Sequence, residues 1–143
     1  MTKRRKIKME NTNGNRPEVI IVTDNESQRL IYRSTVKGAL DALGADAYIR
    51  FAIDGEMALQ KIAQDPNPGK YILFVDHRLP RMNGAQLYSR LTQGLQGRTI
   101  FVTQAENSLR EELSSLGLGK SNPRILGSPV DEGQLKEALS AYV

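Results

Sequence analysis

The chain of 143 residues contains no cysteine, which excludes a disulfide framework and thiolate chemistry. Its length indicates a single domain, long enough to bury a substantial core. No run approaches the roughly 18 apolar residues that a membrane-spanning helix needs. The basic first residues lack the apolar segment of a secretory signal. We therefore expect a cytoplasmic protein that does not contact a membrane.

The net charge of +4 originates at the start of the chain. Residues 1–16 carry six Lys or Arg and one Glu, hence +5, which leaves −1 for residues 17–143. The polar composition of 11–16 predicts that 1–16 is a disordered basic tail before a domain spanning 17–143. Such a tail can attach to nucleic acid or to an acidic partner by charge, or it can be a solvated leader. We expect nucleic-acid contact, if any, only through this tail.

The first half of the domain predicts two strands and two helices. Residues 19–22 are all apolar, which favours a short buried strand. The helix that follows, to about residue 42, carries Val36, Leu40 and Leu43 on one face, and Gly44 ends it. Residues 47–52 predict a second strand, less apolar and therefore nearer an edge of the sheet. A second helix, with Leu59 and Ile62, stops near residue 65.

The second half begins with the most apolar strand and repeats the alternation. Residues 71–75 run without polar interruption into Asp76, which predicts a central parallel strand buried on both faces. Further strands are expected at 98–102 and 123–126, and a closing helix at 131–142. The expected inward residues of the three helices are Leu87, Leu91 and Leu95; Leu109, Leu113 and Leu116; and Leu135 and Leu139.

These five βα units predict an α/β, doubly wound (βα)5 flavodoxin-like fold with a five-stranded parallel sheet in the order 2-1-3-4-5. In this order the strands that end at Asp24 and Asp76 are neighbours at the switch point of the sheet. Thr103 and Ser128 end the fourth and fifth strands at the same rim. Ligands of open α/β sheets bind at this edge, so we expect a site there.

Two convergent carboxylates would repel each other unless a cation or a proton intervenes. A hard divalent ion such as Mg²⁺, bound by carboxylate and carbonyl oxygens, resolves the repulsion and is common beside phosphates. A carboxylate next to Mg²⁺ can attack a phosphoryl group, with a nearby hydroxyl such as that of Thr103 stabilising the oxygens.

At these residues the chain resembles the receiver domains of two-component response regulators. The resemblance covers nearly all of residues 18–143. It implies that Asp76 is the phospho-acceptor, that Thr103 is the switch hydroxyl, and that the backbone carbonyl of Arg78 is a metal ligand beside Asp24 and Asp76. The matching segments are 22–26 (VTDNE), 52–59 (AIDGEMAL), 75–84 (VDHRLPRMNG), 101–105 (FVTQA) and 127–129 (GSP).

Three positions depart from the family pattern. Thr23 stands where the family has the first acid of its pair, Ser128 where it has a lysine, and Ile125 where it has the switch aromatic residue. We therefore expect weak Mg²⁺ binding and a weak or absent response to phosphorylation. The resemblance also implies a cis peptide bond before Pro129.

Several side chains have simpler interpretations. Asp24 can cap the helix that follows it, His77 is expected to be an exposed loop residue, and the Arg78 side chain can face solvent or the pocket.

The leading functional hypothesis is a stand-alone receiver-like module that acts by protein–protein contact and is not an enzyme. Its expected partners are a histidine kinase, a phosphotransfer protein, another signalling protein or a second copy of the chain. The alternatives are a conventional phosphorylatable single-domain response regulator and an aspartate-nucleophile phosphohydrolase. A hydrolase of that kind needs an acid where Arg78 stands.

Overall fold

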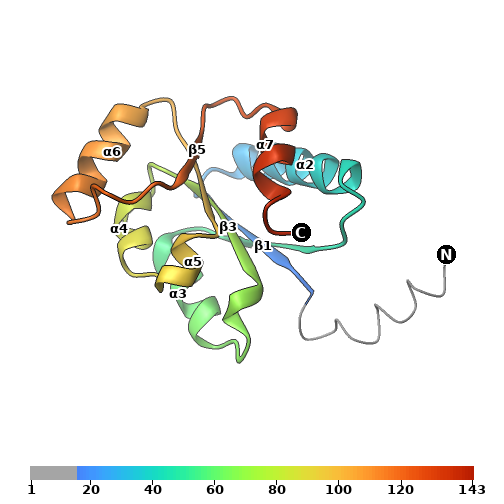
Figure 1. Cartoon of the computed structure of the whole chain (residues 1–143), viewed down its shortest axis with the longest axis horizontal. Helices are drawn as coiled ribbons and strands as arrows, with labels where there is room; N and C mark the ends of the chain where they lie inside the picture. The colour runs from blue at the N-terminus through green and yellow to red at the C-terminus, as the bar shows by residue number, and fades with distance from the viewer. Residues whose placement is uncertain (1–15) are drawn as a thin grey trace.

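The computed structural model describes residues 16–143 and contains a parallel five-stranded sheet in the order β2-β1-β3-β4-β5 (Figure 1). This confirms the predicted fold class and strand order, with β3 in the centre and β2 at an edge. The strands are β1 (Glu18–Val22), β2 (Tyr48–Ala52), β3 (Tyr71–Asp76), β4 (Thr99–Val102) and β5 (Arg124–Leu126). The helices are α2 (Glu26–Ala42), α3 (Gly55–Ala63), the 3₁₀ turn η1 (Pro68–Lys70), α4 (Gly84–Ser89), α5 (Gln93–Gln96), α6 (Glu106–Ser115) and α7 (Glu132–Leu139).

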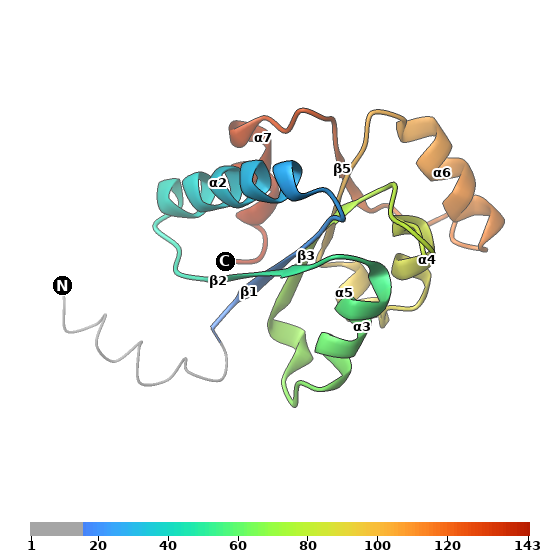
Figure 2. The same ribbon diagram turned by 180° about the vertical axis from the view of Figure 1, so that it is seen from behind.

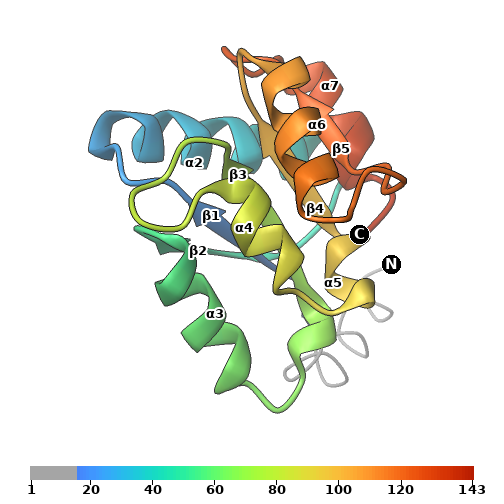
Figure 3. The ribbon, with the colours of Figure 1, turned by 90° about the vertical axis from the view of Figure 1, so that its left-hand side faces the viewer.

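Helices cover both faces of the sheet, and strand alternation divides the core between them. One face packs Val19, Ile21 and Phe74 against α2 and α7, which lie side by side in Figures 1 and 2. The other face packs Val75 and Phe101 against α3, α4 and α6. Figure 3 shows α4 crossing this second face between α3 and α6. Because both faces are covered, the central strand is apolar along its length until it reaches Asp76.

The register of the parallel strands places the site residues at one edge. Val22 pairs with Val75, so Thr23 lies level with Asp76. Asp76 itself pairs with Val102, so Thr103 follows on the next strand. The backbone N–H of His77 donates to the Val102 carbonyl at 3.1 Å, which extends the pairing one residue beyond β3.

Two helix predictions were wrong in detail. A single helix through Leu87, Leu91 and Leu95 was expected, but α4 ends at Ser89 and a second short helix starts after Thr92, whose hydroxyl accepts from the Leu95 N–H. Threonine competes in this way with continued helical bonding, while all three leucines stay buried as predicted. Leu116 is 42% exposed, because α6 ends at Ser115 and the chain leaves the inner face there.

Arg16 is the first residue that the structure describes, and it contacts the domain. The guanidinium of Arg16, assigned above to the tail, lies 4.0 Å from the centre of the Tyr48 ring and pairs with Asp46. Residues 1–15, which contain the rest of the predicted tail, lie outside the described residues. No helix within residues 16–143 is both long and apolar enough to cross a bilayer.

Candidate functional site

The carboxyl edge of the sheet contains a cavity of about 440 Å³. The loops after β1, β3, β4 and β5 all contribute to its walls, as the topology requires. The five residues that the sequence assigned to a site all line it: Asp24, Asp76, Arg78, Thr103 and Ser128. The chain therefore brings these residues together, while their chemical roles remain predictions.

Asp76 is held by two hydroxyl groups, one on each carboxylate oxygen. Thr23 Oγ1 donates to Oδ2 at 2.5 Å, and the Tyr32 hydroxyl donates to Oδ1 at 2.7 Å. Burial raises the pKa of the Asp76 carboxyl, the two hydrogen bonds act in the opposite direction, and the charge of Asp24 adds to the increase. The hydroxyl at Thr23 thus binds the carboxylate that an acid at this position would have repelled.

Tyr32 is a site residue that the sequence analysis missed. Its ring lies on the inner face of α2 and meets Phe74 edge-on, with 5.0 Å between ring centres. Burial, with the bond to Asp76, raises the pKa of the Tyr32 phenol well above its ordinary value, so it remains a donor. The signal was available, because Tyr32 precedes Val36 by four residues and therefore shares its inward face.

The burial of His77 differs from the prediction. It was expected to be an exposed loop residue, but its side chain is 2% exposed. Because the backbone pairing with Val102 continues past β3, His77 stays at the edge of the sheet. The Gly84 N–H also donates to the His77 carbonyl at 2.9 Å. Its ring nitrogens lie 3.0 Å from Thr103 Oγ1 and 2.9 Å from Glu112 Oε1 on α6.

The remaining predicted residues occupy the rim. The Arg78 side chain is exposed, and Ser128 is partly buried, with its carbonyl 3.5 Å from the Gln104 amide nitrogen. The peptide bond between Ser128 and Pro129 is cis, as the resemblance implied. Among residues 16–143 no group of three His, Cys, Asp or Glu side chains is placed to hold a metal ion.

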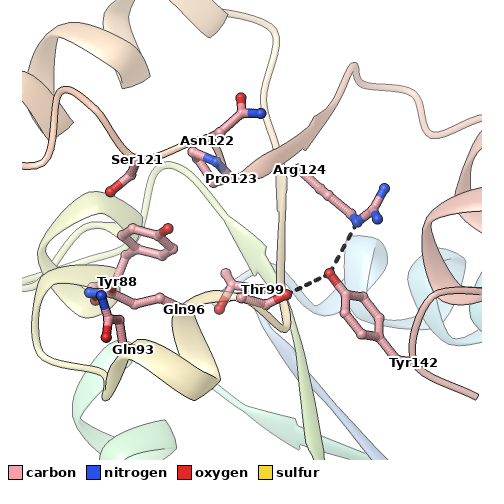
Figure 4. A pocket seen from close by; sticks show the side chains of 10 residues that line it. Tyr88, Gln93, Gln96, Thr99, Ser121, Asn122, Pro123, Arg124 and Tyr142 are labelled. Carbon is pink, nitrogen blue, oxygen red and sulfur yellow. Dashed lines mark hydrogen bonds between the residues drawn. The ribbon is translucent and has the colours of Figure 1, made fainter.

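A second cavity, of about 550 Å³, lies at the opposite edge, where β4 and β5 begin (Figure 4). Arg124 Nε donates to the Tyr142 hydroxyl at 3.1 Å, and that hydroxyl donates to the Gly97 carbonyl at 2.8 Å. These bonds attach the C-terminal segment to the start of β4. We therefore assign them a structural role, separate from the Asp76 cavity.

Comparison with known proteins gives the same fold. No protein-family model matches the sequence, and no curated protein sequence matches it. Solved structures do match. Chemotaxis protein CheY4 of Vibrio cholerae is 18% identical with a TM-score of 0.64, covering 90% of this chain and 99% of its own. A response regulator receiver protein from Pseudomonas putida is 24% identical with a TM-score of 0.61, covering 88% and 97%. A receiver domain protein from Clostridium thermocellum is 11% identical with a TM-score of 0.68, covering 88% and 93%.

The fold of the chain is that of response regulator receiver domains. The likeness spans nearly the whole length of each solved structure, so it concerns the complete domain and not a shared fragment.

Proposed function

We propose that this chain is a receiver domain of two-component signalling, with Asp76 at the phospho-acceptor position. The observation that supports this most strongly is the convergence of Asp24, Asp76 and Thr103 on one cavity at the end of the central strand. In the reaction, an Asp76 oxygen bonds to phosphorus as the bond from phosphorus to the donor breaks. The products are an acyl phosphate and the released donor group.

The same geometry argues for a slow or weakly switched acceptor. The Thr23 and Tyr32 hydroxyls stabilise the unreacted Asp76 carboxylate. This stabilisation decreases when one carboxylate oxygen forms its bond to phosphorus and loses negative charge. Ser128 offers a neutral hydrogen bond where the family has a lysine, and charge-assisted bonds are roughly twice as strong. A phosphoryl group can shift a conformational equilibrium only by its differential interaction with the two states.

We propose that the domain acts mainly by protein–protein contact, with a histidine kinase, a phosphotransfer protein or another signalling protein as its partner. Leu30 and Ile31 are 65% and 57% exposed on α2, close along the helix to Gln28, which lines the cavity. These two exposed apolar side chains lie in the same part of α2 as Gln28 and give such a partner a contact surface.

The residues present fit a weak magnesium site. The Asp24 and Asp76 carboxylates and the Arg78 carbonyl would hold the ion, which would neutralise phosphoryl oxygens. Each carboxylate oxygen has two lone pairs, so the hydroxyl donors leave Asp76 one acceptor position per oxygen. With two acids and no lysine the pocket has the same formal charge, −2, as the family's three acids and one lysine.

The metal assignment predicts the result of a titration. Replacing Asp24 by Asn should abolish Mg²⁺ binding, because the neutral amide removes one of two negative ligands. Isothermal titration or amide NMR shifts around residue 76 would measure this. Asp46→Asn is a matched control, because Asp46 is an exposed acid that pairs with Arg16 away from the cavity. Undiminished binding by the Asp24 variant would contradict the assignment.

The acceptor assignment is tested by intact mass after incubation with acetyl phosphate and Mg²⁺. We expect slow, partial gain of one phosphoryl group, and no gain in the Asp76→Asn variant. Rapid, complete modification would favour the alternative of a conventional phosphorylatable response regulator. Modification that persists in Asp76→Asn would refute the acceptor position, and phosphate release without accumulation would favour the phosphohydrolase alternative.

A further inference from the structure

A series of hydrogen bonds, buried at His77 and Thr103, leads from the cavity to helix α6. The Ala105 backbone N–H donates to Thr103 Oγ1 at 2.9 Å. Thr103 Oγ1 lies 3.0 Å from His77 Nδ1, and His77 Nε2 lies 2.9 Å from Glu112 Oε1. The His77 side chain is 2% exposed, whereas that of Glu112 is 32% exposed. The series of hydrogen bonds therefore starts at Thr103, the predicted switch hydroxyl, and ends at Glu112 on the surface of α6.

For a neutral His77 ring, counting hydrogens gives the direction of these bonds. A carboxylate only accepts, so the His77 Nε2 that faces Glu112 carries a hydrogen. In the neutral ring this is the only hydrogen on nitrogen, so Nδ1 has a free lone pair and accepts from the Thr103 hydroxyl. That hydroxyl has a single hydrogen, and its oxygen already accepts from Ala105. Its hydrogen therefore points to His77 and is not available to an anion on Asp76.

We propose that Glu112 is a positioning residue that controls Thr103 through the tautomer of His77. While Glu112 binds Nε2–H, the Thr103 hydroxyl is committed to His77. When the Glu112 contact is lost, the ring hydrogen moves to Nδ1 and donates to Thr103 Oγ1. The hydroxyl hydrogen is then free to donate to a phosphoryl oxygen on Asp76, and this last step rests on the function proposed above.

Through Glu112, helix α6 is coupled to the Asp76 cavity. Such coupling is reciprocal, so an anion that engages Thr103 weakens the Glu112 contact by the same factor by which loss of that contact favours the anion. Leu109 and Leu113 anchor the inner face of α6 in the core, and the partly exposed Glu112 joins the same helix to His77. This coupling runs through His77, so it does not require an aromatic residue at position 125, where the chain has isoleucine.

Because the chain has a single histidine, its ring signals need no assignment to a residue, and the pattern of couplings to the ring protons distinguishes Nδ1 from Nε2. Long-range ¹H–¹⁵N spectra of the full chain should show His77 as the Nε2–H form. Glu112→Gln should keep this form, since the amide oxygen still accepts, and Glu112→Leu should shift it toward Nδ1–H. Glu111→Leu, on the same helix and exposed, is the control and should leave the tautomer unchanged.

Beryllofluoride with Mg²⁺ serves as the phosphoryl probe. We expect Glu112→Leu to bind it roughly two- to tenfold more tightly than the native chain, the range that one freed hydrogen bond supplies. Glu112→Gln and Glu111→Leu should bind it like the native chain. The native spectrum should shift toward Nδ1–H as the probe binds.

The outcomes separate the two proposals. A native His77 that is already Nδ1–H, or protonated on both nitrogens, would overturn the inference whatever binds to Asp76. A tautomer shift in Glu112→Leu with unchanged beryllofluoride affinity would overturn the control of Thr103. The expected tautomers without binding of the probe by any variant would support control of the His77 tautomer by Glu112 and would contradict the phospho-acceptor function.

Discussion

Replacing Tyr32 by Phe is expected to accelerate phosphorylation of Asp76 by roughly ten- to a hundredfold. The Tyr32 hydroxyl donates to one of the two Asp76 oxygens at 2.7 Å. Hydrogen bonds to charged groups contribute about 1.5–3 kcal/mol, and each 1.4 kcal/mol changes a rate by about tenfold. Because the bond stabilises the unreacted carboxylate more than the reacting one, its removal lowers the barrier.

The substitution also changes the pH dependence in a defined direction. The hydrogen bond from Tyr32 lowers the pKa of Asp76, so its loss raises that pKa above the native value. The acid limb of the pH–rate profile should therefore move to higher pH in the variant, while the rate on the alkaline side increases. Intact mass measured over time with acetyl phosphate and Mg²⁺, at a series of pH values, would record both effects.

A matched control exists at the other edge of the sheet. Tyr71 donates its hydroxyl to Asp65 at 2.5 Å, so Tyr71→Phe removes a similar bond without touching Asp76. It should leave the phosphorylation rate unchanged. Phe at position 32 keeps the ring that packs on Phe74, so folding should be preserved. If Tyr32→Phe is modified no faster than the native chain, the hydroxyl does not restrain Asp76.

The sequence predicted the fold because its strands differ in character. The run that ends at Asp76 is apolar on both faces, the strand at Tyr48–Ala52 is partly polar, and the sheet places them centrally and at an edge. Asp24 and Thr103 could be placed at the site for a topological reason, since parallel strands end at one edge. Chain order and hydrophobic pattern were sufficient for these residues.

The side-chain partners could not be predicted in the same way. Tyr32 shares a helix face with Val36, but the distance from its hydroxyl to Asp76 depends on how α2 packs on β3. His77 carries no apolar pattern, and it is buried because backbone pairing continues past β3. Glu112 lies 35 residues from His77 and on another element, so nothing local in the sequence connects them. These contacts depend on tertiary geometry and not on periodicity.

Replacing Gly84 by Ala is expected to destabilise the domain and to disturb the site at once. A Cβ at this position would lie 2.8 Å from the Asp76 carbonyl oxygen and 3.2 Å from the His77 Cα. Both atoms belong to the backbone at the end of the central strand, so neither can move away as a flexible side chain would. The Gly84 N–H also donates to the His77 carbonyl, which fixes the approach.

Overpacking of this kind reduces the free energy of unfolding by about 1–3 kcal/mol. For a domain of this size, each kcal/mol lowers the melting temperature by roughly 2–8 °C. Thermal and urea unfolding would measure the loss, and the amide signals of residues 76–84 and 103 should shift in the folded variant. The shifts are expected because the strain moves the backbone from which Asp76 and His77 project.

Gly94→Ala is the matched control for this prediction. Gly94 lies in α5, and apart from its chain neighbours and the backbone of its own helix no atom stands within 4 Å of where its Cβ would be. Alanine there should leave the free energy of unfolding unchanged or raise it by up to about 1 kcal/mol, since alanine favours the helix. Equal stability of the two variants would show that the backbone at residues 76 and 77 moves to accommodate the added methyl group of Gly84→Ala without loss of stability. The close approach of α4 to β3 would then not be what holds Asp76 and His77 in position.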